Sequence, residues 1–287
     1  MAIQLHEVCF TFFSRIGSSA TESCHSRWVG ISVKWKFINA GVAGSSHRAT
    51  NMPCQDSCYV GAVQVADEEV LVAVASDGAG SAAKADVSSD FVCTELFAVV
   101  ESWLQKQTTL QMPTHETIVR WIEDTRRGLQ AKATEQQSQL RDYACTLLFA
   151  LIGNSFSSYV QIGDGAIVTD DGENYVPVFW PESGEYANMT YFLTDEDFDK
   201  HLRVKTLEST SHEVGIFTDG LQRLALKYDT LTAHSPFFRP MFQRLRKEPP
   251  GMSILLSDAL SAFLDSPQIN ERTDDDKTLI LASCRDI

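Results

Sequence analysis

The stretch VLVAVASDGAGSA, residues 70–82, constrains the fold of this chain more than any other segment. Its small and β-branched apolar residues favour a strand buried on both faces, and the strand ends in Asp77, which Gly78 and Gly80 closely follow. A carboxylate at the end of a buried strand costs free energy unless a cation or several hydrogen-bond donors meet it. The rest of the chain must therefore bring a partner to Asp77.

Acidic residues stand where apolar strands meet turns at other places as well. They are Asp56 before SCYVGAVQV, Asp164 in YVQIGDGA, Asp219 after VGIFT, and Asp274, Asp275 and Asp276 before KTLILAS. Any one of them has an ordinary explanation, because Asp-Gly is a common turn dipeptide. Several carboxylates gathered at strand ends are, however, the oxygen ligands that Mg²⁺ or Mn²⁺ requires. We therefore expect a metal ion to meet Asp77, with the glycines allowing close approach of the backbone.

The composition excludes some classes of partner. A formal net charge of −14 argues against nucleic acid, since binding phosphate backbones needs clustered Lys and Arg. The seven scattered cysteines include no C-x-x-C pair, which favours a reducing, cytoplasmic setting over a disulfide framework or a standard zinc site. Residues 1–27 form a weakly patterned extension without a signal peptide, and no window reaches the ~18 apolar residues of a membrane span.

The order of the expected elements indicates the fold class. Strand-like segments come in blocks, with helical stretches at 83–105, 114–139 and 253–264 between them. A further helix in SPFFRPMFQRLRK is interrupted by Pro240. The expected strands are VGISVKWKFI, SCYVGAVQV, EVLVAVAS, CTLLFALIG, SSYVQIGDGAIVTD, VPVFW, EVGIFTD and KTLILAS. Without regular βαβ alternation, this order predicts an α+β sandwich of largely antiparallel sheets.

Five short segments carry a resemblance to a known family. They are CQDS (54–57), SDGAGS (76–81), QIGDGA (161–166), FTDGLQRL (217–224) and DDDKTLIL (274–281). In this order they resemble the successive motifs of the metal-dependent protein phosphatases of type 2C, and GSSH before the first motif resembles a bacterial branch. The resemblance covers residues 28–287. It implies a four-layer α/β/β/α sandwich with two central antiparallel β-sheets and a two-metal centre at one edge of the sheets.

The resemblance also implies roles for individual residues. Asp77 is similar to the carboxylate that bridges both metals, and the carbonyl of Gly78 to a further ligand. Asp219 and Asp275 are similar to ligands of the other metal, with Asp276 in the place of the family's usual Asn. The implied reaction is hydrolysis of phosphoserine and phosphothreonine in proteins by a water that two cations, Mn²⁺ or Mg²⁺, activate. The implied partners are phosphorylated proteins and a cognate kinase.

Departures from the family pattern affect the metal side of the site. Asp56 matches the acid beside the first metal shell, but Gln55 replaces a Glu, so we expect weaker metal binding there. Many relatives hold a third metal between the acid matching Asp164 and another Asp, at which position this chain has Arg223. A guanidinium repels a cation, so we expect two metals and a pairing of Asp164 with Arg223.

Further departures affect the substrate side. The usual His after Asp-Gly is Ala79, and the Arg that grips phosphate is Asn51. Among nearby residues, Arg48 could contact phosphoryl oxygens, and His47 could donate a hydrogen bond or protonate the leaving alkoxide. Both could equally be ordinary loop residues, and metal-bound water could serve as the acid.

Two functions stay open at this point. The first is an active serine/threonine phosphatase, supported by the presence of Asp56, Asp77, Asp219 and Asp275. The second is a catalytically weak or inactive relative that binds phosphoproteins as a regulatory module, which Gln55 in place of Glu and Ala79 in place of His suggest. Survival of the bridging aspartate favours the enzyme.

Overall fold

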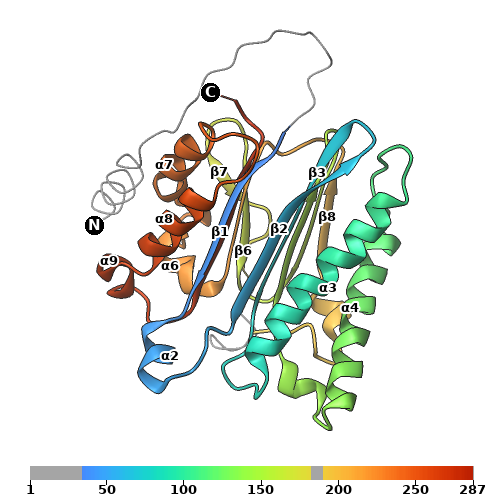
Figure 1. The fold of residues 1–287 in the computed structure, drawn as a ribbon. Helices are drawn as coiled ribbons and strands as arrows, with labels where there is room; N and C mark the ends of the chain where they lie inside the picture. Colours follow the sequence, from blue (N-terminus) through green and yellow to red (C-terminus); the bar gives the residue numbers. More distant parts are fainter. Residues whose placement is uncertain (1–33, 182–189, 287) are drawn as a thin grey trace.

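The computed structural model describes residues 34–181 and 190–286 of the chain (Figure 1). The expected extension at residues 1–27 lies outside the described residues. The first expected strand, at 29–38, overlaps the observed strand β1 only at its end, since β1 spans Lys36–Val42. The part of that expectation before residue 34 also lies outside the described residues.

Five strands form one antiparallel sheet, in the order β2-β3-β4-β5-β8. Their bounds are β2 Asp56–Val65, β3 Glu68–Asp77, β4 Leu147–Ile152, β5 Ser157–Ile162 and β8 Arg203–Leu207. The sequence predicted the first four strands but not β8, which has no completely buried residue and lies at the edge of the sheet. A half-buried edge strand leaves a weaker apolar pattern than a central one.

Six strands form the second sheet, in the order β12-β1-β13-β9-β6-β7. Besides β1, their bounds are β12 Gly251–Met252, β13 Lys277–Ser283, β9 Glu213–Phe217, β6 Ala166–Asp170 and β7 Tyr175–Pro177. All neighbours are antiparallel except the short pair of β1 and β12.

Helices cover the outer face of each sheet (Figure 1). α3 (Ala85–Gln105) and α4 (His115–Glu135) lie against the five-stranded sheet, whereas α7 (Ser235–Leu245) and α8 (Ile254–Leu264) lie against the six-stranded sheet. Three apolar clusters fill the spaces between these layers: one under α3 and α4, one between the sheets, and one under α7 and α8. Three interfaces make four layers, which confirms the predicted α/β/β/α sandwich.

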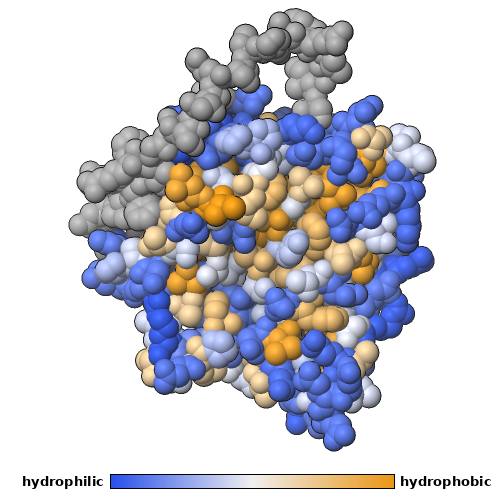
Figure 2. All heavy atoms as spheres, in the orientation of Figure 1, coloured by the Kyte–Doolittle hydropathy of each residue, from blue (hydrophilic) through white to orange (hydrophobic). Residues whose placement is uncertain are grey.

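Short elements connect the layers. They are α2 (Ser45–Thr50), α5 (Phe198–His201), α6 (Gln222–Ala225), α9 (Pro267–Asn270), the 3-10 turns η1 (Leu140–Tyr143) and η2 (Asp219–Leu221), and the strands β10 (Leu226–Lys227) and β11 (Thr232–Ala233). On the face drawn in Figure 2, hydrophilic residues predominate over the helical sides, and apolar residues gather toward the middle.

Local sequence explains where the long helices begin. The Thr114 side chain caps α4 by accepting a hydrogen bond from Thr117 N, and the Ser253 side chain caps α8 in the same way. Pro240 does not end α7, although the sequence suggested an interruption. Proline removes one backbone hydrogen bond, and the fully buried face that includes Phe237 and Phe242 offsets this loss.

One crossover sets the place of Asp164. The stretch SSYVQIGDGAIVTD, predicted as a single strand-like segment, forms two strands, β5 and β6, which belong to different sheets. The chain passes between the sheets at Gly163, whose φ of +96° favours glycine. At Gly165 a Cβ atom would lie 2.8 Å from the backbone oxygen of Phe217, at the end of β9. The two glycines thus place Asp164 where the ends of both sheets meet.

Candidate metal centre

Three aspartates from three segments meet at this end of the sandwich. Asp77 ends β3, Asp164 lies in the crossover, and Asp219 begins η2 directly after β9 and Thr218. Each offers one carboxylate oxygen, and these oxygens all lie within 4.8 Å of one another. Such spacing is compatible with shared ligation of a divalent cation.

Burial and mutual repulsion make this group costly without a cation. Burial, together with the charges of the neighbouring acids, raises the pKa of Asp219 to about 8 and that of Asp77 well above its usual range. Burial also raises the pKa of Asp164. Across the described residues no Lys, Arg or His forms an ion pair with any of the three, and Asp164 Oδ1 is buried without a hydrogen bond. The residues present therefore fit a hard divalent metal ion.

Asp56 stands beside this group in the five-stranded sheet. It lies directly opposite Asp77 in the pairing of β2 with β3. Burial, helped by the charge of Asp276, raises the pKa of Asp56 to about 7, while a hydrogen bond from Thr218 acts in the opposite direction. That bond, from Thr218 Oγ1 to Asp56 Oδ2, is 2.6 Å long. The same hydroxyl oxygen accepts a hydrogen bond from Thr278 N, so Thr218 ties the two sheets together beside the site.

Gly78 and Ala79 follow Asp77 in tight packing. A Cβ atom at Gly78 would lie 2.3 Å from Ala85 O at the start of α3, so only glycine fits there. Its backbone N–H donates to Gln55 O at 3.0 Å, which joins the first two motifs. Ala79 is buried and has no group that could transfer a proton.

Adjacent residues Asp275 and Asp276 do different things. Asp275 is exposed and lies outside the tight group, although its charge contributes to the raised pKa of Asp77 and Asp219. Asp276 is 3% exposed, and its Oδ1 accepts a hydrogen bond from Gly44 N at 2.6 Å. Its Oδ2 accepts one from Gln55 N at 2.6 Å. Asp276 thus fastens the first motif to the last.

His47 and Arg48 are neighbours on α2 but have different partners. His47 Nδ1 lies 2.9 Å from Asp276 Oδ2, so the imidazole lies close to the first motif. Arg48 instead pairs with Asp265 at 2.5 Å on the surface. In this structure the Arg48 guanidinium therefore lies with Asp265 and not with the group of Asp77, Asp164 and Asp219.

The expected pairing of Asp164 with Arg223 is not formed among the described residues. Asp164 Oδ2 accepts a hydrogen bond from Thr190 at 2.6 Å, and its backbone oxygen accepts one from the Gln222 side chain. Arg223 is exposed, and its charge acts on Tyr228. The Gln222 side chain thus contacts the backbone of Asp164, and no ion pair between Arg223 and Asp164 is present among the described residues. The prediction of this ion pair is wrong.

Three threonines that the sequence analysis missed hold the acids. Thr190 and Thr218 donate to Asp164 and Asp56, and Thr146 Oγ1 accepts a 2.9 Å hydrogen bond from Asp77 N. Thr218 could have been found from its place directly before Asp219. Thr190 has no comparable sequence signal, because it lies 26 residues from its partner.

A hollow of about 530 Å³ lies elsewhere, against β7, the β10–β11 pair and the start of α7. It shares no residue with the carboxylate group, so it is separate from the candidate metal centre.

In the described part of the chain, no helix is long and apolar enough to cross a membrane.

Comparisons with known proteins agree with this geometry. The family model for protein phosphatase 2C matches residues 43–265. The chain is 36% identical over 252 residues to serine/threonine-protein phosphatase 3 of Escherichia coli (strain K12), covering 87% of this chain and 98% of that protein. The structure of the serine/threonine phosphatase Stp1 from Staphylococcus aureus has the same fold, with a TM-score of 0.55 at 18% identity, over 91% of this chain and 99% of Stp1.

A second solved structure is the catalytic domain of the serine/threonine protein phosphatase PstP in complex with two manganese ions. It has a TM-score of 0.54 at 13% identity, over 87% of this chain and 98% of that domain. The motif order, the four layers, the family model and the E. coli relative all lead to one conclusion. The chain belongs to the protein phosphatase 2C family.

Proposed function

We propose that this protein hydrolyses phosphoserine and phosphothreonine in proteins and requires two divalent cations, Mn²⁺ or Mg²⁺. The observation that carries the proposal is the group of Asp77, Asp164 and Asp219, whose carboxylate oxygens lie within 4.8 Å of one another. Family membership supports the reaction class, and the manganese complex of PstP supports the choice of metal. We assign residues 28–287 to the catalytic domain and residues 1–27 to an extension.

The chain's own residues divide the work of binding metal. Asp77 would hold both cations, with the Gly78 carbonyl and Asp219 as further ligands, and Asp275, at the start of the last motif, would complete the set. Asp164 lies within reach of the same ions. When bound, the two cations supply a strong nucleophile at neutral pH and neutralise charge on the phosphoryl oxygens.

Other residues support the ligands or face the substrate. Asp56 is a catalytic-site acid beside Asp77, and Gln55 and Asp276 hold the first motif in place. Arg48 contacts substrate phosphate after leaving Asp265, and His47 protonates the leaving alkoxide. The substrates are phosphorylated proteins, with a cognate kinase in the cytoplasm.

A second function has one observation in its favour. Gln55 replaces a charged ligand, and its Oε1 is buried without a hydrogen-bond partner among the described residues. A neutral oxygen attracts a cation less than a carboxylate does. This favours a weakly active relative that binds phosphoproteins as a regulatory module.

One experiment separates these functions. The full chain is incubated with a phosphoserine peptide in the presence of chelator, Mn²⁺ or Mg²⁺, and released phosphate and peptide binding are both measured. Phosphate release that depends on metal and is lost in Asp77→Asn supports the enzyme. Tight peptide binding without phosphate release at any metal concentration refutes it in favour of the regulatory module.

A further inference from the structure

The short helix α2 is attached to the protein by polar contacts. None of its residues is buried, so apolar packing does not hold it in place. Ser46 donates to Asp274 O twice, from its backbone N at 3.0 Å and from its hydroxyl at 2.7 Å. At Gly44, directly before the helix, a Cβ atom would lie 2.3 Å from the same oxygen. Gly44 and Ser46 thus hold α2 close against the segment that carries the last acidic motif.

Asp276 is the centre of this attachment. Its carboxylate accepts backbone N–H groups from Gly44 and Gln55 and contacts His47 Nδ1. Both carboxylate oxygens of Asp276 already act as acceptors of backbone N–H groups, so we assign Nδ1 as the donor in the contact with His47. The other ring nitrogen, Nε2, makes no hydrogen bond with the described residues, and the side chain keeps 15% exposure. The ring is therefore fixed at one nitrogen and free at the other.

This arrangement occurs in a chain that lacks an acid next to the metal-binding loop. Ala79 follows Gly78 and cannot transfer a proton. Asp276 occupies a position where the resemblance implies a neutral Asn, and a neutral amide would not hold a histidine through a charge-assisted hydrogen bond. Ala79 thus removes one proton donor from the site, whereas Asp276 holds another, His47, in place.

We propose that Asp276 is a positioning residue that orients His47 so that Nε2 protonates the leaving oxygen of the substrate. This inference rests on the proposed phosphatase function. The bond between phosphorus and the serine oxygen breaks, and its electron pair stays on that oxygen, which takes the proton from Nε2 of the imidazolium form of His47 and leaves a neutral ring with its hydrogen on Nδ1. The oxygen of the attacking water forms the new bond to phosphorus. The water gives up a proton to solvent, and solvent returns one to the imidazole.

The test compares two substrates that differ in their need for an acid. The full chain with Mn²⁺ hydrolyses a phosphoserine peptide, whose alkoxide is a poor leaving group, and p-nitrophenyl phosphate, whose leaving group needs little protonation. We expect His47→Ala and Asp276→Asn each to lower kcat for the peptide by about 100-fold or more, as for loss of a general acid, and to change kcat for the aryl phosphate by less than about threefold. Asp274→Asn is the matched control, because its side chain is exposed and forms no hydrogen bond or ion pair with the described residues, and we expect it to keep wild-type rates.

The double variant separates positioning from a purely structural role. If Asp276 acts through His47, Asp276→Asn has no further effect on peptide kcat in a His47→Ala background. An equally large loss in that background, or equal slowing of both substrates, overturns the inference. Should Asp276→Asn fail to fold, His47→Gly with added imidazole gives the second measurement: rescue of peptide hydrolysis but not of aryl phosphate hydrolysis supports the role of His47, and no rescue overturns it.

The same assay distinguishes this inference from the proposed function. A wild-type protein that hydrolyses neither substrate with any metal refutes the phosphatase function itself. A wild-type protein that hydrolyses both, with a His47→Ala variant of unchanged peptide kcat, refutes only the role assigned to Asp276 and His47.

Discussion

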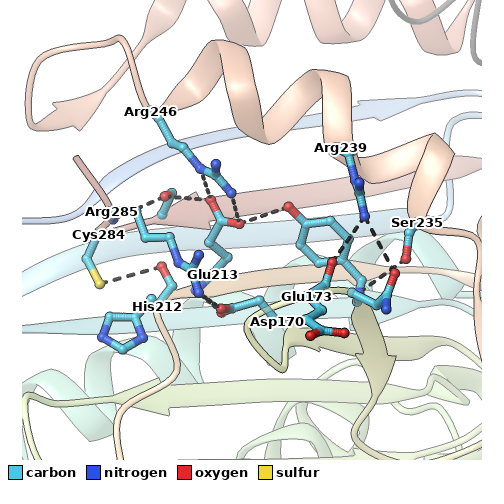
Figure 3. Close-up of polar contacts among 12 residues, drawn as sticks. Asp170, Glu173, His212, Glu213, Ser235, Arg239, Arg246, Cys284 and Arg285 are labelled. Atoms are coloured by element: carbon cyan, nitrogen blue, oxygen red, sulfur yellow. Dashed lines mark hydrogen bonds and ion pairs between the residues drawn. The ribbon is translucent and has the colours of Figure 1, made fainter. Parts of the chain in front are cut away.

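Buried acids lie at both ends of the six-stranded sheet, but the two groups differ in whether cationic side chains of the described residues pair with them. At the end drawn in Figure 3, Glu213 at the start of β9 is fully buried and accepts two hydrogen bonds from Arg246, at 2.8 and 2.7 Å. Asp170 there pairs with Arg285. At the other end of β9, Asp219 joins Asp77 and Asp164, and none of the three has a cationic partner among the described residues.

This difference shows that burial alone does not identify a functional acid. Tyr175 OH at 2.8 Å and Ser283 Oγ at 2.9 Å complete the hydrogen bonds of Glu213, so its charge is satisfied within the fold. Asp219 has its pKa raised to about 8 because burial and neighbouring acids oppose its charge. A buried acid with internal partners supports the scaffold, whereas a buried acid without them requires a ligand from outside.

The largest expected effect is on catalysis at the unpaired end. Asp219→Asn keeps the shape of the side chain but removes a ligand charge, and the loss of metal binding should lower kcat/KM by about 10³-fold. In chelator, the variant should be at least as stable as the wild type, because one repelling charge is gone. Steady-state kinetics with Mn²⁺ and thermal unfolding with chelator measure the two effects. Unchanged activity would place the metal elsewhere.

The second prediction makes the same kind of change at the paired end. Glu213→Gln should lower the free energy of unfolding by roughly 3 kcal/mol, at the low end for a broken buried ion pair because Arg246 retains access to water. The kinetic constants of the folded protein should not change. Urea unfolding and steady-state kinetics test this. A loss of activity without a loss of stability would mean that the two ends are not separate in function.

The sequence identified the acids at the unpaired end better than it identified those at the paired end. Asp77 and Asp219 could be found because each follows a strong apolar strand and precedes a glycine. This pattern is local and can be seen in a single sequence. The partnership of Glu213 with Arg246 joins residues 33 apart, and no local pattern encodes it. Asp164 was expected beside the metal centre, but the crossover between sheets that carries it was not, because that stretch looked like one strand-like segment.

A third prediction concerns pH and uses the unpaired end. The pKa values of Asp56 and Asp219 rise from 3.8 to about 7 and about 8 in the folded protein, chiefly through burial. Between about pH 4 and pH 8 the folded protein therefore binds more protons than the unfolded chain, so its stability falls as pH rises.

In chelator we expect a loss of on the order of 4 kcal/mol between pH 6 and pH 8.5, measured by urea unfolding. Saturating Mn²⁺ should remove most of this loss, because the cation stabilises the ionised acids. Stability that rises with pH in chelator would contradict the assignment of the raised pKa values. The Glu213→Gln variant, in which the paired end is broken, should keep the same slope.

A fourth prediction tests the neutral ligand position. Gln55→Glu adds a carboxylate where a buried oxygen has no partner among the described residues. The Mn²⁺ concentration for half-maximal activity should fall by about tenfold, because a charged oxygen binds a hard cation more tightly than an amide does. Metal titration of activity measures this effect. Gln161→Glu would be an unsuitable control, because the Gln161 side chain supports the crossover. Gln64→Glu, on the distant part of β2, serves instead and should not change the metal requirement. An unchanged requirement in Gln55→Glu would place Gln55 away from the metal.

The smallest expected effect concerns Arg48, a cation that belongs to neither end. Its ion pair with Asp265 is exposed, so Arg48→Ala should change the free energy of unfolding by less than about 1 kcal/mol. If the guanidinium leaves Asp265 to contact substrate phosphate, Arg48→Ala raises KM severalfold with little change in kcat. Asp265→Asn then acts in the opposite direction, because it frees Arg48 and lowers KM. Phosphopeptide kinetics for the two variants decide the matter: equal KM values in both would leave Arg48 as a surface residue that holds α2 against Asp265.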